Sequence, residues 1–380
     1  MSNFLNKVMC ISLSLFIFGC GGENNEKTKI QNKAEDTFLT DNLDLQMLSQ
    51  TKEAMDKLNK NDIWSGYQLS HQRIYMIKVK NQVPVGGYLI NPSHYINGAE
   101  QLGDNEDQGL NTFRYDINIK EAYKSLSANH GNGTYSFDYK IDGEGYYIQT
   151  YDMKSVDINS GPADGSIRLL AHELFHDYQN NRFTTPAGYL QKMDGYPIQE
   201  DLISLALLMK SEMYDLPTKL TKGEAIEKLK RYVAIKSEEI RLDQSSRLLV
   251  KNMGLGQEQI EGSAYYLDTM LGKGIFPYAV DATFFNSDGY NLELTDRMSV
   301  QETFGWLYFY SSGASAIFLL DRAGFDIKKL EKGLSPYAAA KQFISIDEND
   351  EVRLLAQMKE DYPWDLIQAI AEDHYKKHSK

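Results

Sequence analysis

Apolar residues recur at helical spacing through the opening segment and through most of the second half of the chain. In these segments hydrophobic side chains return every three to four positions, which predicts amphipathic or buried helices. The predicted helices are 41–59, 166–183, 200–213, 222–249, 257–271 and 304–323, with several short ones after Asp326.

The region between residues 74 and 153 has a different pattern. Short runs of β-branched and aromatic residues are separated there by Gly, Pro and Asn, which is typical of strands and turns. The predicted strands are 74–77, 88–90, 134–137 and 146–151. We therefore expect an α+β protein, with a mixed N-terminal lobe over 41–160 and a mainly helical lobe over 161–380.

The N-terminus has the pattern of an exported lipoprotein. An apolar run from Met9 to Phe18 follows a weakly cationic start and is too short to span a bilayer, so residues 1–19 are predicted to be a signal peptide. The segment Ile17-Phe18-Gly19-Cys20 resembles a bacterial lipobox, which implies that Cys20 carries a lipid; the alternative is a plain signal peptide with an incidental cysteine. Polar residues 20–40 predict a flexible tether. We expect the protein in the bacterial cell envelope, lipid-anchored to a membrane, with its domain in the periplasm or outside the cell.

The charge of the chain bears on its class of partner, and its cysteine content bears on disulfide formation. The formal net charge is −13 and no basic patch stands out, which argues against a nucleic-acid partner. The chain has only 2 cysteines; Cys10 would leave with the signal peptide and Cys20 would be lipidated, so no disulfide is expected in the mature protein.

The segment His172-Glu173-Leu174-Phe175-His176 matches the HExxH pattern of zinc peptidases. Histidines four positions apart share one face of a helix, which suits two imidazoles binding one tetrahedral ion. Glu173 projects from the neighbouring face, where its carboxylate can act as general base toward a water that the metal activates. The alternative is a pair of surface histidines beside an ordinary glutamate.

The helix around this motif is amphipathic. Its apolar stripe consists of Ile167, Leu170, Ala171, Leu174, Phe175 and Tyr178. The two histidines lie away from the centre of this stripe, so we expect one side of the helix in a core and the other facing a cleft. Asp177 and Asp268 are candidates to orient a histidine through its second ring nitrogen.

A catalytic zinc site needs a third protein ligand, and the residues leave two candidates. No third histidine follows at short spacing, so a carboxylate is expected. Glu200 begins an apolar helix, whereas Glu261 is followed by Gly262 and Ala264, small residues that allow a neighbouring backbone to come close.

The segment from Glu261 to Tyr266, Glu-Gly-x-Ala-x-Tyr, resembles the third-ligand helix of the gluzincin zinc peptidases. This resemblance implies that His172, His176 and Glu261 hold a single zinc ion and that Glu173 is the base. It further implies that Tyr310, in Tyr-Ser-Ser-Gly-Ala, stabilises the oxyanion, with Tyr308 and Tyr265 as rivals. By position, strand 145–153 would be the edge strand that aligns a peptide. Two features depart from the family: a longer gap before Glu261, and no Gly-Ala-Met-Glu-Asn motif before the zinc helix.

These observations predict a membrane-anchored zinc hydrolase that cleaves peptide bonds. Two other functions stay open at this point. One is a binding lipoprotein that keeps a gluzincin-like fold without turnover, and the other is a zinc hydrolase of a non-peptide substrate.

Overall fold

The computed structural model describes residues 40–60, 63–103, 109–130, 134–156, 165–186, 189, 195–214, 216–275, 284–285, 292 and 294–379. The predicted signal peptide, Cys20 and the tether up to residue 39 lie outside these ranges. No helix within them is both long and apolar enough to cross a bilayer. The chain divides into two compact units: the described residues of the first fall within Met1–Met55, Leu69–Ser160 and Asp164–Ile167, and those of the second within Asp56–Gln68, Gly161–Ala163 and Arg168–Lys380.

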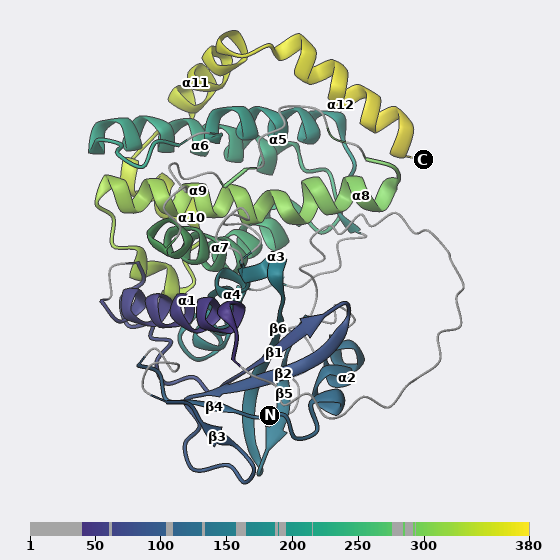
Figure 1. The fold of residues 1–380 in the computed structure, drawn as a ribbon. Helices are drawn as coiled ribbons and strands as arrows, with labels where there is room; N and C mark the ends of the chain where they lie inside the picture. The colour runs from purple at the N-terminus through teal and green to yellow at the C-terminus, as the bar shows by residue number, and fades with distance from the viewer. Residues whose placement is uncertain are drawn as a thin grey trace. The chain divides into compact units, whose positions relative to one another are not determined.

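The first unit contains one mixed sheet (Figure 1). Its strands are β1 (Ile74–Lys80), β2 (Val83–Ile90), β3 (Glu100–Gln101), β4 (Thr112–Arg114), β5 (Tyr135–Ile141) and β6 (Glu144–Tyr151), in the order β3-β4-β2-β1-β6-β5. The helices are α1 (Asn42–Asn59), which ends in the second unit, α2 (Ile119–His130) and α3 (Met153–Val156). Buried side chains of β1, β2, β5, β6 and α2 share one core, which explains the apolar runs in their sequences.

The position of β6 corrects one expectation from the sequence. Strand 145–153 was expected at an edge of the sheet, but β6 pairs in parallel with β1 and antiparallel with β5. Both of its hydrogen-bonding edges are therefore occupied, and it cannot add a peptide strand. The edge strands are β5 and β3.

The second unit is helical. Its helices are α4 (Ser166–Arg182), whose first two residues belong to the first unit, α5 (Glu200–Met213), α6 (Lys222–Leu242), α7 (Leu255–Ile275), α8 (Arg297–Glu302), α9 (Tyr308–Ala323), the 3₁₀ helix η6 (Ile327–Lys332), α10 (Pro336–Ile344), α11 (Glu348–Asp361) and α12 (Trp364–His378). In Figure 1, α5 and α6 form a layer between the α11–α12 pair and α9. The α+β class and the order of strands followed by helices are thus confirmed.

The ends of several helices differ from the predicted ranges, and two π-helical turns precede α7 and α9. The predicted helix 222–249 ends earlier, at Leu242, where Asp243 is an extended C-cap residue. The π-helix η4 (Val250–Gly254) then leads into α7. The π-helix η5 (Thr303–Leu307) joins α8 to α9, so the helical run that was expected to begin at 304 begins at Arg297. Such turns often occur near functional sites, and here they precede the helices that carry Glu261 and Tyr310.

Helices α7 and α9 cross at two glycines. A Cβ on Gly262 would lie 2.9 Å from Gly313 Cα, and a Cβ on Gly313 would lie 2.6 Å from the Glu258 carbonyl oxygen. Only residues without a side chain permit this distance between backbones. The close approach that the small residues after Glu261 predicted is therefore confirmed.

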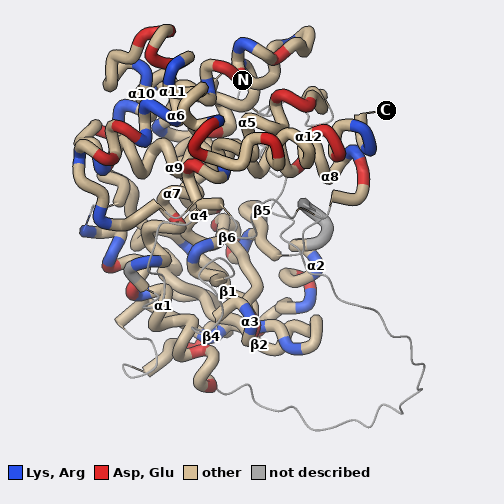
Figure 2. The backbone as a smooth tube through the Cα atoms, turned by 90° about the horizontal axis from the view of Figure 1, so that it is seen from above, with Lys and Arg blue, Asp and Glu red and all other residues tan. Residues whose placement is uncertain are grey.

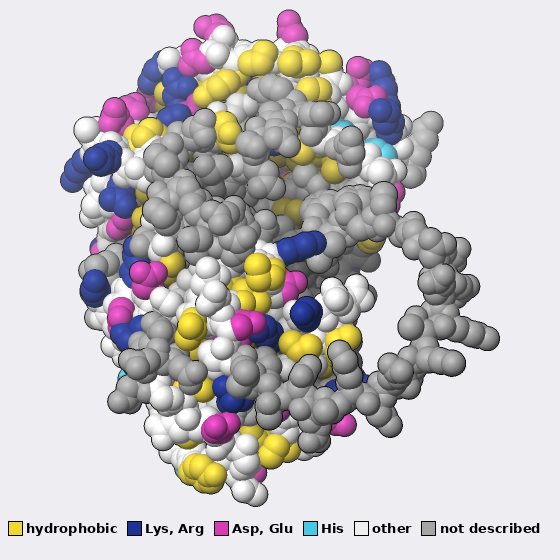
Figure 3. Space-filling view, in the orientation of Figure 1, with side chains coloured by type: hydrophobic (Ala, Val, Ile, Leu, Met, Phe, Trp, Pro, Cys, Tyr) yellow, Lys and Arg dark blue, Asp and Glu magenta, His cyan; other side chains and the backbone are white. Residues whose placement is uncertain are grey.

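Charges of both signs are mixed along the surface helices. Figure 2 shows acidic and basic residues close together on α12, where Lys376 pairs with Glu372 and Lys377 with Asp373. On the described part of the face in Figure 3, Lys and Arg side chains are likewise intermingled with Asp and Glu.

Candidate metal centre

Helix α4 is held in place by its apolar side. The predicted stripe is buried except for Tyr178, which is half-buried, and Phe175 is fully enclosed. The Phe175 ring packs edge-on against Trp64, Tyr67 and Phe183, at centroid distances of 5.2, 5.0 and 6.0 Å. Tyr67 also donates a hydrogen bond to the carbonyl oxygen of Ala171. These contacts fix the rotation of α4 about its axis, and with it the direction of the side chains on the other side.

The histidine side of α4 is buried as well. His172, Glu173 and His176 are only 3%, 4% and 5% exposed. Helix α7 places Glu261 against them, which an analysis of α4 as an isolated helix could not reveal.

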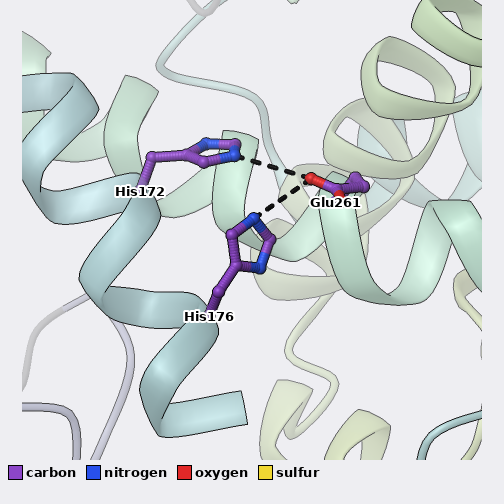
Figure 4. A group of neighbouring side chains, drawn as sticks. All are labelled: His172, His176 and Glu261. Carbon is purple, nitrogen blue, oxygen red and sulfur yellow. Dashed lines mark ion pairs between the residues drawn. The ribbon is translucent and has the colours of Figure 1, made fainter. Parts of the chain in front are cut away.

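His172, His176 and Glu261 converge on one point (Figure 4). The Oε2 atom of Glu261 lies 3.6 Å from His172 Nε2 and 3.2 Å from His176 Nε2. One ligand atom from each residue lies within 4.8 Å of the other two. Metal–ligand bonds of about 2.0–2.1 Å in a tetrahedron place neighbouring ligand atoms roughly 3.3 Å apart. The three buried side chains can therefore hold a metal ion without large movement.

Both histidines are oriented through their Nδ1 atoms. His172 Nδ1 lies 2.9 Å from Asp268 Oδ2, and the other carboxylate oxygen of Asp268 accepts from Arg168. His176 Nδ1 lies 2.6 Å from Gln179 Oε1. Because an acceptor faces each Nδ1, the proton is assigned there, and the Nε2 lone pairs remain for a metal.

These contacts decide between the two acids proposed to orient the histidines. Asp268 takes that role for His172, whereas Asp177 is exposed on α4. Gln179 was missed, although its position three residues after His176 places both on one helical face. Its amide nitrogen donates to Ile260 O and Ser263 Oγ, which ties α4 to α7 beside Glu261.

The electrostatic environment favours positive charge between the three candidate ligands. Burial lowers the pKa of His172, but hydrogen bonds to Asp268 and Glu261 outweigh it and raise the pKa to about 10. The pKa of His176 is also raised: burial opposes this, and the charge of Glu261 outweighs it. Burial would raise the pKa of Glu261, yet the two histidines hold it well below its ordinary value. Protons and a cation therefore compete for this site.

Of the tyrosines considered from the sequence, Tyr310 lies at the candidate ligands. Its ring is almost parallel to that of His172, with a centroid distance of 6.4 Å and an interplanar angle of 4°. Burial, followed by the charge of Glu261, raises the pKa of its hydroxyl far above the ordinary value, so the group keeps its proton. The rival Tyr308 instead donates to Glu239 and accepts from Lys236, and the ring of Tyr265 packs against Phe284.

The structure also distinguishes between the two candidates for the third ligand. Glu261 is 6% exposed and belongs to the three-residue group, whereas Glu200 is the first residue of α5 and is only partly buried. Within the described part of the chain, the group of possible ligands around these histidines contains Glu261 and not Glu200.

A second buried charge cluster lies one helical turn before Glu261. The Lys236 ammonium, which is fully buried, lies 2.7 Å from Glu239 Oε2 and 3.0 Å from Glu258 Oε1. Glu258 also accepts from Tyr232 and from Ser312. Because these residues belong to α6, α7 and α9, the cluster joins the helices that carry Glu261 and Tyr310.

Comparisons with protein-family models, curated proteins and solved structures found no match to this chain.

Proposed function

We propose that this protein is a zinc-dependent hydrolase, a metallopeptidase of gluzincin type that cleaves peptide bonds. The observation that carries the proposal is the buried His172, His176 and Glu261 group with the Glu173 carboxylate beside it. Two imidazoles and one carboxylate are the protein ligands of catalytic zinc in peptidases, with a further position left for water.

Zinc held there would act as a Lewis acid and lower the pKa of a bound water toward neutrality. Glu173 would remove the proton from the attacking water and deliver it to the leaving amine. Its charge acts on His172, His176 and Tyr310, which supports this role because the carboxylate lies close to the candidate ligands. Tyr310 would donate a hydrogen bond to the carbonyl oxygen as it gains negative charge.

The metal and the activity can be tested together on the full chain in detergent. Wild type is expected to retain a single zinc ion and to cleave members of a broad peptide library. Glu173→Gln should retain zinc and lose cleavage, because the base acts on water and not on the ion. His172→Ala should lose both.

The outcome also separates the proposal from its alternatives. A protein that binds zinc but cleaves no peptide would be a non-catalytic binding protein or a hydrolase of another substrate. A His172→Ala variant with full zinc content would refute the assignment of the metal site.

We also propose that a lipid on Cys20 anchors the protein to a membrane of the cell envelope. In bacteria that carry out lipoprotein maturation, wild type should incorporate labelled fatty acid and sediment with membranes, and Cys20→Ala should do neither. Labelling that persists in Cys20→Ala would refute the anchor.

A further inference from the structure

The two carboxylate oxygens of Glu261 have different surroundings. Oε2 faces the Nε2 atoms of His172 and His176. Oε1 lies 2.7 Å from the hydroxyl oxygen of Tyr189, which donates a hydrogen bond to it. The carboxylate is therefore held in one orientation, with a single oxygen directed at the place where a metal would bind.

Tyr189 reaches Glu261 from the segment that follows α4. Its backbone N–H donates to Pro186 O. A Cβ on Gly256, in the first turn of α7, would lie 3.3 Å from Pro186 Cβ and 3.4 Å from Tyr189 Cβ. The absence of a side chain at Gly256 thus lets Pro186 and Tyr189 rest on α7 about one turn before Glu261.

We propose that Tyr189 is a positioning residue of the metal centre, which holds Glu261 as a one-oxygen ligand through the hydrogen bond to Oε1. This proposal rests on the proposed function and adds a residue that neither the HExxH pattern nor the gluzincin resemblance assigned. A phenol suits the role, since it is a neutral donor that keeps its proton at ordinary pH. With Oε1 bonded to Tyr189, only Oε2 binds the ion, and a coordination position stays open for water.

The test compares the zinc affinities of full-length wild type and Tyr189→Phe by competition with a chromogenic chelator. Loss of such an outer hydrogen bond is expected to weaken zinc binding about 10- to 100-fold. Tyr178→Phe is the matched control, because Tyr178 lies on α4 and donates to Glu331 rather than to a candidate ligand. Its zinc affinity should equal that of wild type. The melting temperature of each metal-free protein separates a positioning role from a general loss of stability.

Two further measurements test the role of Tyr189 independently. Cobalt-substituted Tyr189→Phe should give a changed d–d absorption spectrum, because freeing Oε1 allows Glu261 to bind through both oxygens and alters the coordination geometry. Gly256→Val should displace Tyr189 from α7 and, like Tyr189→Phe, lower the zinc affinity. If Tyr189→Phe does not fold, the zinc affinity of Gly256→Val is the test of the proposal.

Unchanged zinc affinity in a folded Tyr189→Phe, or in Gly256→Val if that variant alone folds, would overturn this inference while leaving the proposed function intact. Wild type that binds no zinc would instead overturn the proposed function itself.

Discussion

Replacing Gly313 by alanine tests whether the close crossing of α7 and α9 builds the metal centre. The new Cβ would lie 2.6 Å from Glu258 O, 2.7 Å from Glu258 Cα and 2.9 Å from Glu258 Cβ. Carbon atoms in favourable contact are about 3.5–4.0 Å apart, so the helices must separate by roughly 1 Å. The obstructing atoms are mostly backbone, and no change of rotamer can move them away.

The expected magnitude follows from two opposing effects. Alanine is favoured over glycine inside a helix by about 1 kcal/mol. Overpacking a core costs about 1–3 kcal/mol, and a gap of 0.5–1 Å between packed surfaces loses about a quarter to a half of their attraction. The second effect acts along the whole interface between α7 and α9, so we expect the free energy of unfolding to fall by about 2 kcal/mol. The separation should also shift α7, and with it Glu261, relative to His172 and His176, and so weaken zinc binding.

Urea denaturation of the metal-free proteins measures the change in the free energy of unfolding, and chelator competition measures the change in zinc affinity. Gly223→Ala is the matched control, because a Cβ on that glycine of α6 meets nothing within 4 Å. That variant should be as stable as wild type or more stable by up to about 1 kcal/mol. A Gly313→Ala protein with wild-type stability and zinc affinity would refute the reasoning, since the crossing would then tolerate a side chain.

Other predictions concern the charges and the hydroxyl at the same helices. Tyr310→Phe should keep zinc and fold but lower kcat about a hundredfold or more, as expected for loss of one oxyanion donor, and near-normal kcat would remove this residue from the mechanism. The raised pKa of His172, about 10, means that the metal-free protein keeps this imidazole protonated through neutral pH, and the stability that the proton contributes is lost as pH rises through the folded pKa. Zinc binding should therefore release the proton of His172, and its affinity should rise with pH below the pKa of that residue; a dissociation constant that does not change between pH 6 and 8 would contradict this. Lys236→Met should lower the free energy of unfolding by about 3–5 kcal/mol, because Glu239 and Glu258 would lose the buried cation between them; denaturation that matches wild type would show that the cluster contributes little.

The sequence by itself determined those features that depend on short-range spacing. The apolar stripe of α4 predicted both the helix and its buried side, and the spacing of His172 and His176 predicted that their rings would share a face. The glycine after Glu261 predicted a close approach by another backbone. Each of these follows from residues a few positions apart, whose relative placement is dictated by helix geometry.

The tertiary structure alone decided how distant segments meet. It brought Glu261 rather than Glu200 to the histidines, placed β6 inside the sheet, and packed α7 against the histidine side of α4. It also added Gln179, whose amide bridges α4 and α7, and Tyr189, which reaches Glu261 from a separate segment. Such contacts depend on the crossing of whole helices and on hydrogen bonds between remote side chains, and these leave no periodic pattern in the sequence.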